Sequence, residues 1–181
     1  IAVRRGVTQL ILSDKQISDQ KLPIPMLLCV GSINTFLINK KLRGYVSINV
    51  QSGEAMDTHS FATLIGVGAT TVNPYLALDS IYQRFEKKLF GKFDYEECVV
   101  RYIKSINSGL LKIMSKMGIS VLSSYRGGCN FETVGLSRTI VSDYFPGVLS
   151  KVSGIGFQGI EKKLRLIHKE AFKKIGSVLP I

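Results

Sequence analysis

The sequence has few cysteines, and their spacing narrows the chemistry that it can perform. The three cysteines are Cys29, Cys98 and Cys129, an odd number with wide separations and no CxxC pair. This spacing argues against a disulfide framework, a zinc site built from neighbouring residues, and an iron–sulfur cluster. We predict that the cysteines are buried, reduced thiols.

Histidines and phosphate-binding motifs are equally scarce. The two histidines, His59 and His168, have no metal-ligand set or Ser-His-Asp order around them. The sequence also lacks a Walker lysine-serine pattern and a GxGxxG fingerprint. A glycine-rich run at residues 66–69 follows a helical pattern rather than a strand, so we interpret it as a helix C-terminus. We therefore predict no catalytic residue, no cofactor-binding residue and no metal ligand in this chain.

Long apolar runs are also absent. A membrane-spanning helix needs roughly 18–20 consecutive apolar residues, and no run approaches that length. The two N-terminal arginines precede only a short apolar run without a small-residue cleavage site, which argues against a signal peptide. With 45% hydrophobic and 20% charged residues, the chain is predicted to be soluble and cytoplasmic, with one well-buried core.

The formal net charge of +11 raises the question of a nucleic-acid partner. However, the sequence contains no helix-turn-helix, zinc-finger or ribonucleoprotein motif. The basic residues gather on the polar faces of two predicted helices, so we favour a solvated or partner-facing surface over nucleic-acid binding. These residues are Lys87, Lys88 and Lys92 near one helix, and Lys162, Lys163, Arg165, Lys169, Lys173 and Lys174 on the last.

Short β-favouring runs alternate with helical patterns along the chain. Four runs predict strands, at residues 8–12, 45–50, 70–73 and 119–124. Helices are predicted to begin at Pro25, Asp57 and Pro74, a long helix to end at Gly118, and an amphipathic helix to cover residues 155–176. This alternation predicts an α/β fold with a mainly parallel, four-stranded or similar sheet and covering helices, either half a β/α barrel or a small doubly wound sheet.

The stretch after Phe145, PGVLSKVSG, is the only linker-like segment. We expect one domain overall, with an α/β core at residues 1–145. A linker and a C-terminal amphipathic helix that packs on this core are expected at residues 146–181. Because the first residue is Ile1 rather than Met, and the opening residues look like a helix running into a strand, we expect the chain to be a piece of a longer protein.

Polar residues follow each predicted strand, where parallel α/β folds gather their ligands. These are Ser13-Asp14, Ser52-Gly53-Glu54, Asn73-Pro74 and residues 123–128, and we expect them to lie on one rim. In the last group, a helix starting at residues 129–134 would aim the amides of Gly127, Gly128 and Cys129 at an anion, with Arg126 supplying charge. Alternatively the segment is a structural turn, with Arg126 paired to Glu132 or to a neighbouring domain.

We favour the structural interpretation of this segment, because no established phosphate motif is present. The candidate residues for a domain joint or an anion contact are Ser124, Tyr125, Arg126, Gly127, Gly128 and Glu132.

The same region resembles a known family. Residues 109–137, GLLKIMSKMGISVLSSYRGGCNFETVGLS, are similar to a segment of the glutamate synthase large subunit. Further stretches occur in that family's order: LILSD from Leu10, PIPMLL from Pro23, SGE from Ser52, HSFATLIGVGATTVNPYLA from His59 and YFPGVLSKVSGIG from Tyr144. Two stretches depart from the family's pattern: GVGATT replaces GYGADA at residues 66–71, and GCNF replaces AQIF at residues 128–131.

The resemblance implies a role within a larger enzyme. Glutamate synthases make two glutamates from glutamine, 2-oxoglutarate and a reductant. An amidotransferase domain releases ammonia, which reaches a flavin domain that holds FMN and a 3Fe-4S cluster. This segment resembles the C-terminal half of the central domain, an α/β unit that joins those two domains, and the three cysteines match neither catalytic nor cluster positions.

From this resemblance we expect a structural and coupling domain that is inactive alone and holds no cofactor itself. Its partners would be the FMN and amidotransferase domains, with a small reductase subunit as a further partner that the family allows. NADPH, NADH and ferredoxin all stay open as electron donors. The alternative is a stand-alone α/β domain that binds a phosphorylated ligand or anion at residues 123–128.

Overall fold

A computed structural model describes residues 1–128 and 130–173 of the chain. Three parallel strands form the central sheet in the order β1-β2-β3: β1 (Gln9–Ser13), β2 (Ser47–Gln51) and β3 (Thr71–Asn73). A second parallel pair joins β4 (Glu132–Leu136) to β5 (Leu149–Ile155). The predicted α/β class with parallel strands and covering helices is confirmed, with the strands divided between two small sheets.

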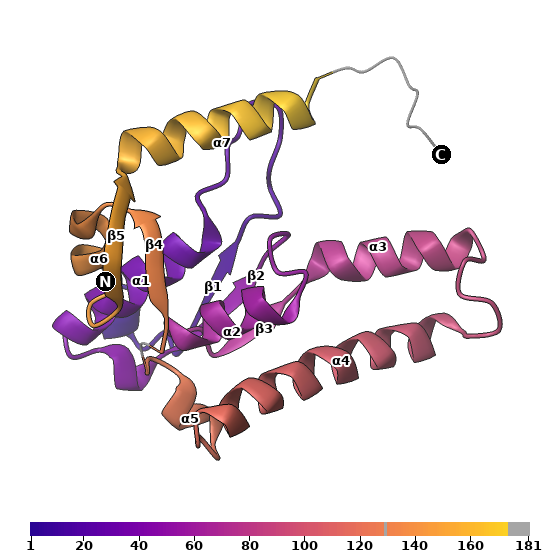
Figure 1. Cartoon of the computed structure of the whole chain (residues 1–181), viewed down its shortest axis with the longest axis horizontal. Coiled ribbons are helices and arrows are strands. Elements are labelled where there is room, and N and C mark those ends of the chain that lie inside the picture. Colours follow the sequence, from indigo (N-terminus) through magenta and orange to yellow (C-terminus); the bar gives the residue numbers. More distant parts are fainter. Residues whose placement is uncertain (129, 174–181) are drawn as a thin grey trace.

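Helices connect and cover these strands (Figure 1). They are α1 (Met26–Asn39), α2 (Thr58–Gly66), α3 (Tyr75–Glu86), α4 (Tyr95–Lys116), α5 (Leu122–Tyr125), α6 (Arg138–Tyr144) and α7 (Phe157–Ala171), with 3-10 turns η1 (Val3–Arg5) and η2 (Arg43–Tyr45). Strands and helices alternate from β1 to α3 in sequential order, which is the arrangement of a β/α-barrel segment. No helix in the described ranges is both long and apolar enough to cross a membrane.

The main core lies around the central strand. Ile48 and Val50 of β2 are almost completely buried, and the residues between and beside them in the strand are partly exposed. Val30 of α1, Phe61 of α2 and Ile106 of α4 pack into the same cluster. Beyond this core, α3 and α4 run back along each other as a long hairpin that extends away from the sheet (Figure 1).

The second sheet is attached to the first unit through α6. Ile140, Val141 and Phe145 form a separate buried cluster, against which Leu27 and Leu28 of α1 pack. Within the β4–β5 pair the two backbones approach closely at Gly154, where an added Cβ would overlap the backbone of Gly135. A glycine is therefore needed at position 154.

The structure overturns three local predictions. Residues 119–124 are not a strand, because Val121 and Leu122 are exposed and the chain instead forms the single helical turn α5, which directs Tyr125 into the core. The predicted helix at residues 129–134 is replaced by β4 from residue 132 onward, since these residues pair with β5. The linker-like segment contains all of β5 except its last residue.

Two further predictions concern the end of the chain. The final helix is shorter than predicted, and residues 174–176 of that prediction lie outside the described residues, as does Cys129. The division at residues 145 and 146 stays a prediction; β5, which follows that boundary, pairs with β4, which precedes it.

A side-chain N-cap supports the predicted start of α2 at Asp57. The Asp57 carboxylate accepts hydrogen bonds from the Ser60 backbone N–H at 2.8 Å and from the Ser60 hydroxyl at 2.6 Å. Asp94 and Ser137 cap α4 and α6 in the same way. The two bonds from Ser60, its hydroxyl first, lower the pKa of Asp57 below its ordinary value of 3.8.

This cap makes stability depend on pH. A carboxylate whose pKa is lowered by folding stabilises the folded state above its unfolded pKa, and this contribution is lost as the pH falls through the folded pKa. We expect Asp57→Ala to reduce the free energy of unfolding by about 1 kcal/mol at pH 7, with a smaller difference below pH 3.8. Asp57→Asn keeps an acceptor that cannot titrate, so it should stay near the original stability at pH 7. Urea unfolding between pH 2.5 and pH 7 checks this, and a pH-independent loss in Asp57→Ala would contradict it.

Candidate functional site

The carboxyl ends of β1 and β2 bring a polar cluster together, as predicted. Asp14 follows β1 and is only 9% exposed. Its carboxylate accepts a hydrogen bond from the Ser52 hydroxyl at 2.6 Å and from the Gly53 backbone N–H at 3.1 Å. The Tyr75 hydroxyl also bonds Asp14, and burial together with this carboxylate raises the pKa of Tyr75 to about 12. Tyr75 thus stays protonated and serves as a hydrogen-bond donor at neutral pH.

Glu54 extends the cluster to α1. Its carboxylate accepts a hydrogen bond from the Met26 backbone N–H at 2.9 Å, which satisfies a donor at the first turn of α1. Burial raises the pKa of Glu54, the Met26 bond opposes that shift, and the Asp14 charge adds to it. The acidic groups at this edge are therefore engaged in holding strands and helix together.

The predicted loop at residues 123–128 lies elsewhere. Tyr125 is 1% exposed, and its hydroxyl donates a hydrogen bond to the Ala62 carbonyl at 3.2 Å. The Gly127 amide donates to the Gly66 carbonyl at 2.9 Å, and the Gly128 amide donates to the Tyr125 carbonyl at 3.1 Å. These two glycine amides thus bond backbone carbonyls of the protein, which agrees with the structural turn favoured from the sequence rather than with the alternative amide cradle.

Arg126 and Glu132 do not form the alternative pair either. Glu132 lies 3.3 Å from the Lys151 ammonium across the β4–β5 pair. Arg126 instead lines a cavity with Thr8 and Ser47, which lie at the amino ends of β1 and β2. The expectation that this loop shares one rim with Asp14 is therefore wrong, because Arg126 lies at the opposite end of the sheet. Ser124 is exposed.

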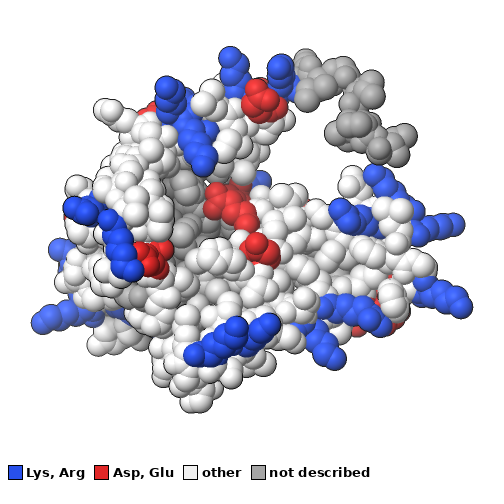
Figure 2. All heavy atoms as spheres, viewed as in Figure 1, with Lys and Arg blue, Asp and Glu red and all other residues white. Residues whose placement is uncertain are grey.

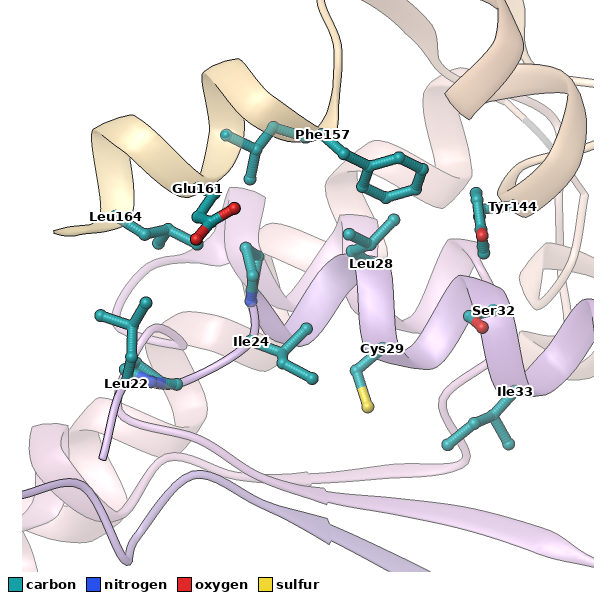
Figure 3. A pocket seen from close by; sticks show the side chains of 13 residues that line it. Leu22, Ile24, Leu28, Cys29, Ser32, Ile33, Tyr144, Phe157, Glu161 and Leu164 are labelled. Carbon is teal, nitrogen blue, oxygen red and sulfur yellow. The ribbon is translucent and has the colours of Figure 1, made fainter. Parts of the chain in front are cut away.

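A cavity that was not predicted lies between α1 and α7 (Figure 3). It measures about 530 Å³ and is mostly apolar, with Leu28 of α1, Tyr144 of α6, and Phe157 and Leu164 of α7 among its lining residues. Glu161 points toward it from α7, while its carboxylate also pairs with Arg165 at 2.7 Å. This groove requires two helices from opposite ends of the sequence, so no local pattern could indicate it.

His168 explains how α7 is held over this groove. Its Nε2 lies 2.8 Å from the Ser18 carbonyl oxygen, in the loop between β1 and α1. The ring also packs on Phe172. His168 thus has a structural contact, and across residues 1–128 and 130–173 no group of three or more His, Cys, Asp or Glu side chains is placed to hold a metal ion.

On the face shown in Figure 2, the basic residues are spread over several elements and do not form one patch. Lys and Arg project from the ends and outer sides of several elements, and acidic side chains lie around the hollow beneath α7. On this face the basic residues form no continuous stripe of the kind that follows a nucleic-acid backbone.

Comparison with known proteins identifies the family. The family model of the glutamate synthase central domain matches residues 1–137. The chain belongs to the glutamate synthase central domain family. It is 50% identical over 180 residues to the large chain of NADPH glutamate synthase from Azospirillum brasilense, which covers 99% of this chain and 12% of that protein.

Other relatives extend the same match. The large chain of NADPH glutamate synthase from Bacillus subtilis is 47% identical over 174 residues, covering 95% of this chain and 11% of that protein. A chloroplastic ferredoxin-dependent glutamate synthase from Spinacia oleracea is 39% identical over 184 residues, covering 96% of this chain and 11% of that protein. The chain thus spans only 11–12% of the length of these relatives. The segment is common to enzymes named for different electron donors.

Proposed function

We propose that this central-domain segment acts as a structural and coupling element of a larger glutamate synthase, which makes two glutamates from glutamine, 2-oxoglutarate and a reductant. In this proposal the segment joins the glutaminase and FMN domains in the cytoplasm and performs no chemistry alone. The match to the central domain over residues 1–137 and the small share of each relative that the chain spans both support it.

The observation that carries the proposal is an apolar surface on the second sheet. Val134 of β4 and Val152 of β5 are register partners across the pair. They are 68% and 55% exposed, respectively. Leu149 and Ile155 of β5 are exposed on the same pair. Exposed apolar side chains gathered on one strand pair favour a site where another protein surface packs.

Helix α4 presents a second apolar surface. Cys98, Ile106 and Met114 are buried on its inner side. Val100, Ile103 and Leu111 continue this apolar stripe around the helix beside Met114 and are largely exposed. The apolar stripe of α4 is therefore wider than the part that the core covers, so we assign its uncovered edge to contact with another domain.

We also propose that this segment holds neither of the parent's cofactors, and the chemistry of its cysteines supports this for the cluster. Cys29 lies in α1 and Cys98 in α4, and neither belongs to a three-residue ligand group among the residues described. Burial raises the pKa of the Cys29 thiol, which disfavours the thiolate that binds metals. We therefore place FMN and the 3Fe-4S cluster in other domains of the parent subunit. A small reductase subunit would be a separate partner of that parent.

Two experiments test this proposal. In the first, the purified chain is titrated with FMN and assayed for glutamine-dependent glutamate formation; we expect neither tight FMN binding nor activity. In the second, this chain replaces the matched segment of the Azospirillum brasilense large chain. We expect that chimera to form glutamate from glutamine. Stoichiometric FMN binding by the isolated chain, or a soluble chimera without synthase activity, would count against the proposal.

A further inference from the structure

The cavity at the amino ends of the central strands brings two arginines together. It measures about 390 Å³, and its lining includes Arg43, Arg126 and the hydroxyl-bearing residues Thr8, Ser47 and Thr70. Thr8 and Thr70 precede β1 and β3, and Ser47 begins β2. The cavity therefore lies at the end of the sheet opposite the Asp14 cluster.

Arg43 is held in a fixed position by neutral acceptors. Its Nε donates to Asn34 Oδ1 at 2.6 Å, its Nη1 to the Val46 carbonyl at 2.6 Å, and its Nη2 to the Gly68 carbonyl at 2.8 Å. These bonds use three of the five N–H groups of the guanidinium. They orient the side chain without cancelling its charge.

Arg126 adds a second positive charge beside the first. Burial and then the charge of Arg126 lower the pKa of Arg43. The ion pairs of the described residues join Arg101 to Glu97, Lys151 to Glu132 and Arg165 to Glu161, so they include neither of these arginines. Two like charges in one cavity repel each other, and a bound anion would relieve that repulsion.

The hydroxyl groups add uncharged donors. The Thr70 hydroxyl oxygen accepts a hydrogen bond from the Ile48 backbone N–H at 3.2 Å, so its own proton can be donated to another acceptor. Ser47 and Thr8 bring further hydroxyls to the same wall. Two guanidinium charges match a dianion, and the several donors match the three terminal oxygens of a phosphoryl group better than the two oxygens of a carboxylate.

We propose that this cavity is a phosphate-binding site, in which Arg43 and Arg126 hold the phosphoryl group of inorganic phosphate or of a small phosphate monoester. The site is separate from the apolar surfaces assigned to domain contact and does not depend on the coupling role. It also differs from the amide cradle considered for residues 123–128, because the ligand groups are side chains from four separate parts of the chain.

The test uses isothermal titration of the chain with inorganic phosphate and with glycerol 3-phosphate at low ionic strength. Arg126→Gln is the informative variant, because the described structure gives its guanidinium no ion pair that supports the fold. Arg84→Gln on the exposed side of α3 removes the same charge far from the cavity and serves as the control. We expect saturable binding that weakens about tenfold or more in Arg126→Gln and is unchanged in Arg84→Gln.

The two ligands distinguish the sources of the phosphoryl group. Tighter binding of glycerol 3-phosphate indicates an organic phosphate, and equal binding indicates free phosphate; either result supports the site. Three outcomes would overturn it: no saturable binding of either ligand, equal weakening by both substitutions, or malonate binding as tightly as phosphate. Without ligand, Arg126→Gln should unfold at no lower a temperature than the original chain, because it removes a repulsion; this separates lost binding from lost folding.

Discussion

Val134→Lys combined with Val152→Asp is expected to uncouple glutamate synthesis from glutamine hydrolysis in the chimera with the Azospirillum brasilense large chain. The two valines are register partners and exposed in the isolated segment. Opposite charges across a strand pair attract each other, so the substitutions should leave β4 and β5 paired. Burying these charges under another domain would instead cost several kcal/mol. We expect the glutamate formed per glutamine hydrolysed to fall about tenfold or more.

Two controls make this result specific. Ser153→Asp places a charge on the same strand at a polar, exposed position and should leave the ratio unchanged. The isolated chain with both valine substitutions should unfold within about 1 kcal/mol of the original chain, since exposed substitutions change stability little. If the doubly substituted chimera keeps its ratio, the β4–β5 surface is not a coupling interface.

The second large effect concerns Tyr125. Its ring lies in the cluster formed with Ala62, Ile65 and Met114, and it meets the Phe131 ring edge to face with centroids 6.2 Å apart. Tyr125→Ala removes this buried ring, and we expect a loss of about 3–5 kcal/mol in the free energy of unfolding. Tyr125→Phe loses only the bond to the Ala62 carbonyl, so about 1 kcal/mol is expected.

Urea unfolding of the two Tyr125 variants measures both values. Ser124→Ala, at the exposed neighbouring position, should change stability by less than about 0.5 kcal/mol. A loss below about 1 kcal/mol in Tyr125→Ala would contradict the conclusion that α5 is anchored in the core. The comparison also separates the structural role of this turn from the anion contact first considered for it.

The parts of the fold that the sequence could predict depend on local signals. Alternation along β2 and the acidic cap at Asp57 act within a few residues. Pro25 and Pro74 stand immediately before α1 and α3, as their fixed backbone angle favours. Gly118 adopts a positive φ of 70° at the end of α4, where glycine is favoured. These elements could be predicted because the deciding interactions lie within a few residues along the chain.

The parts that were missed depend on contacts between distant residues. Residues 132–136 become a strand only because β5 pairs with them, and the close approach of Gly154 to Gly135 is not visible in either segment alone. Tyr125 is buried because Ala62 and Met114 lie beside it. Arg43 and Arg126 likewise line one cavity only because the tertiary fold brings them together.

Only part of the candidate site could be predicted, again because some of its residues are brought together by contacts between distant segments. The Asp14 and Ser52 groups follow strands, so the carboxyl-end rule placed them together correctly. Residues 123–128 were assigned to that rim through a strand that does not exist, and the rule failed with it. Arg126 kept its candidate status as an anion contact, although its partners are at the opposite end of the sheet.

The most direct test of the account is to sequence the reading frame on both sides of the gene segment that encodes this chain. We predict that the frame continues upstream into an amidotransferase domain with an N-terminal cysteine nucleophile. Downstream it should continue into an FMN-binding barrel with cluster cysteines. A start codon and a stop codon directly flanking residues 1–181 would contradict the proposal that this chain works as a coupling segment of a larger glutamate synthase.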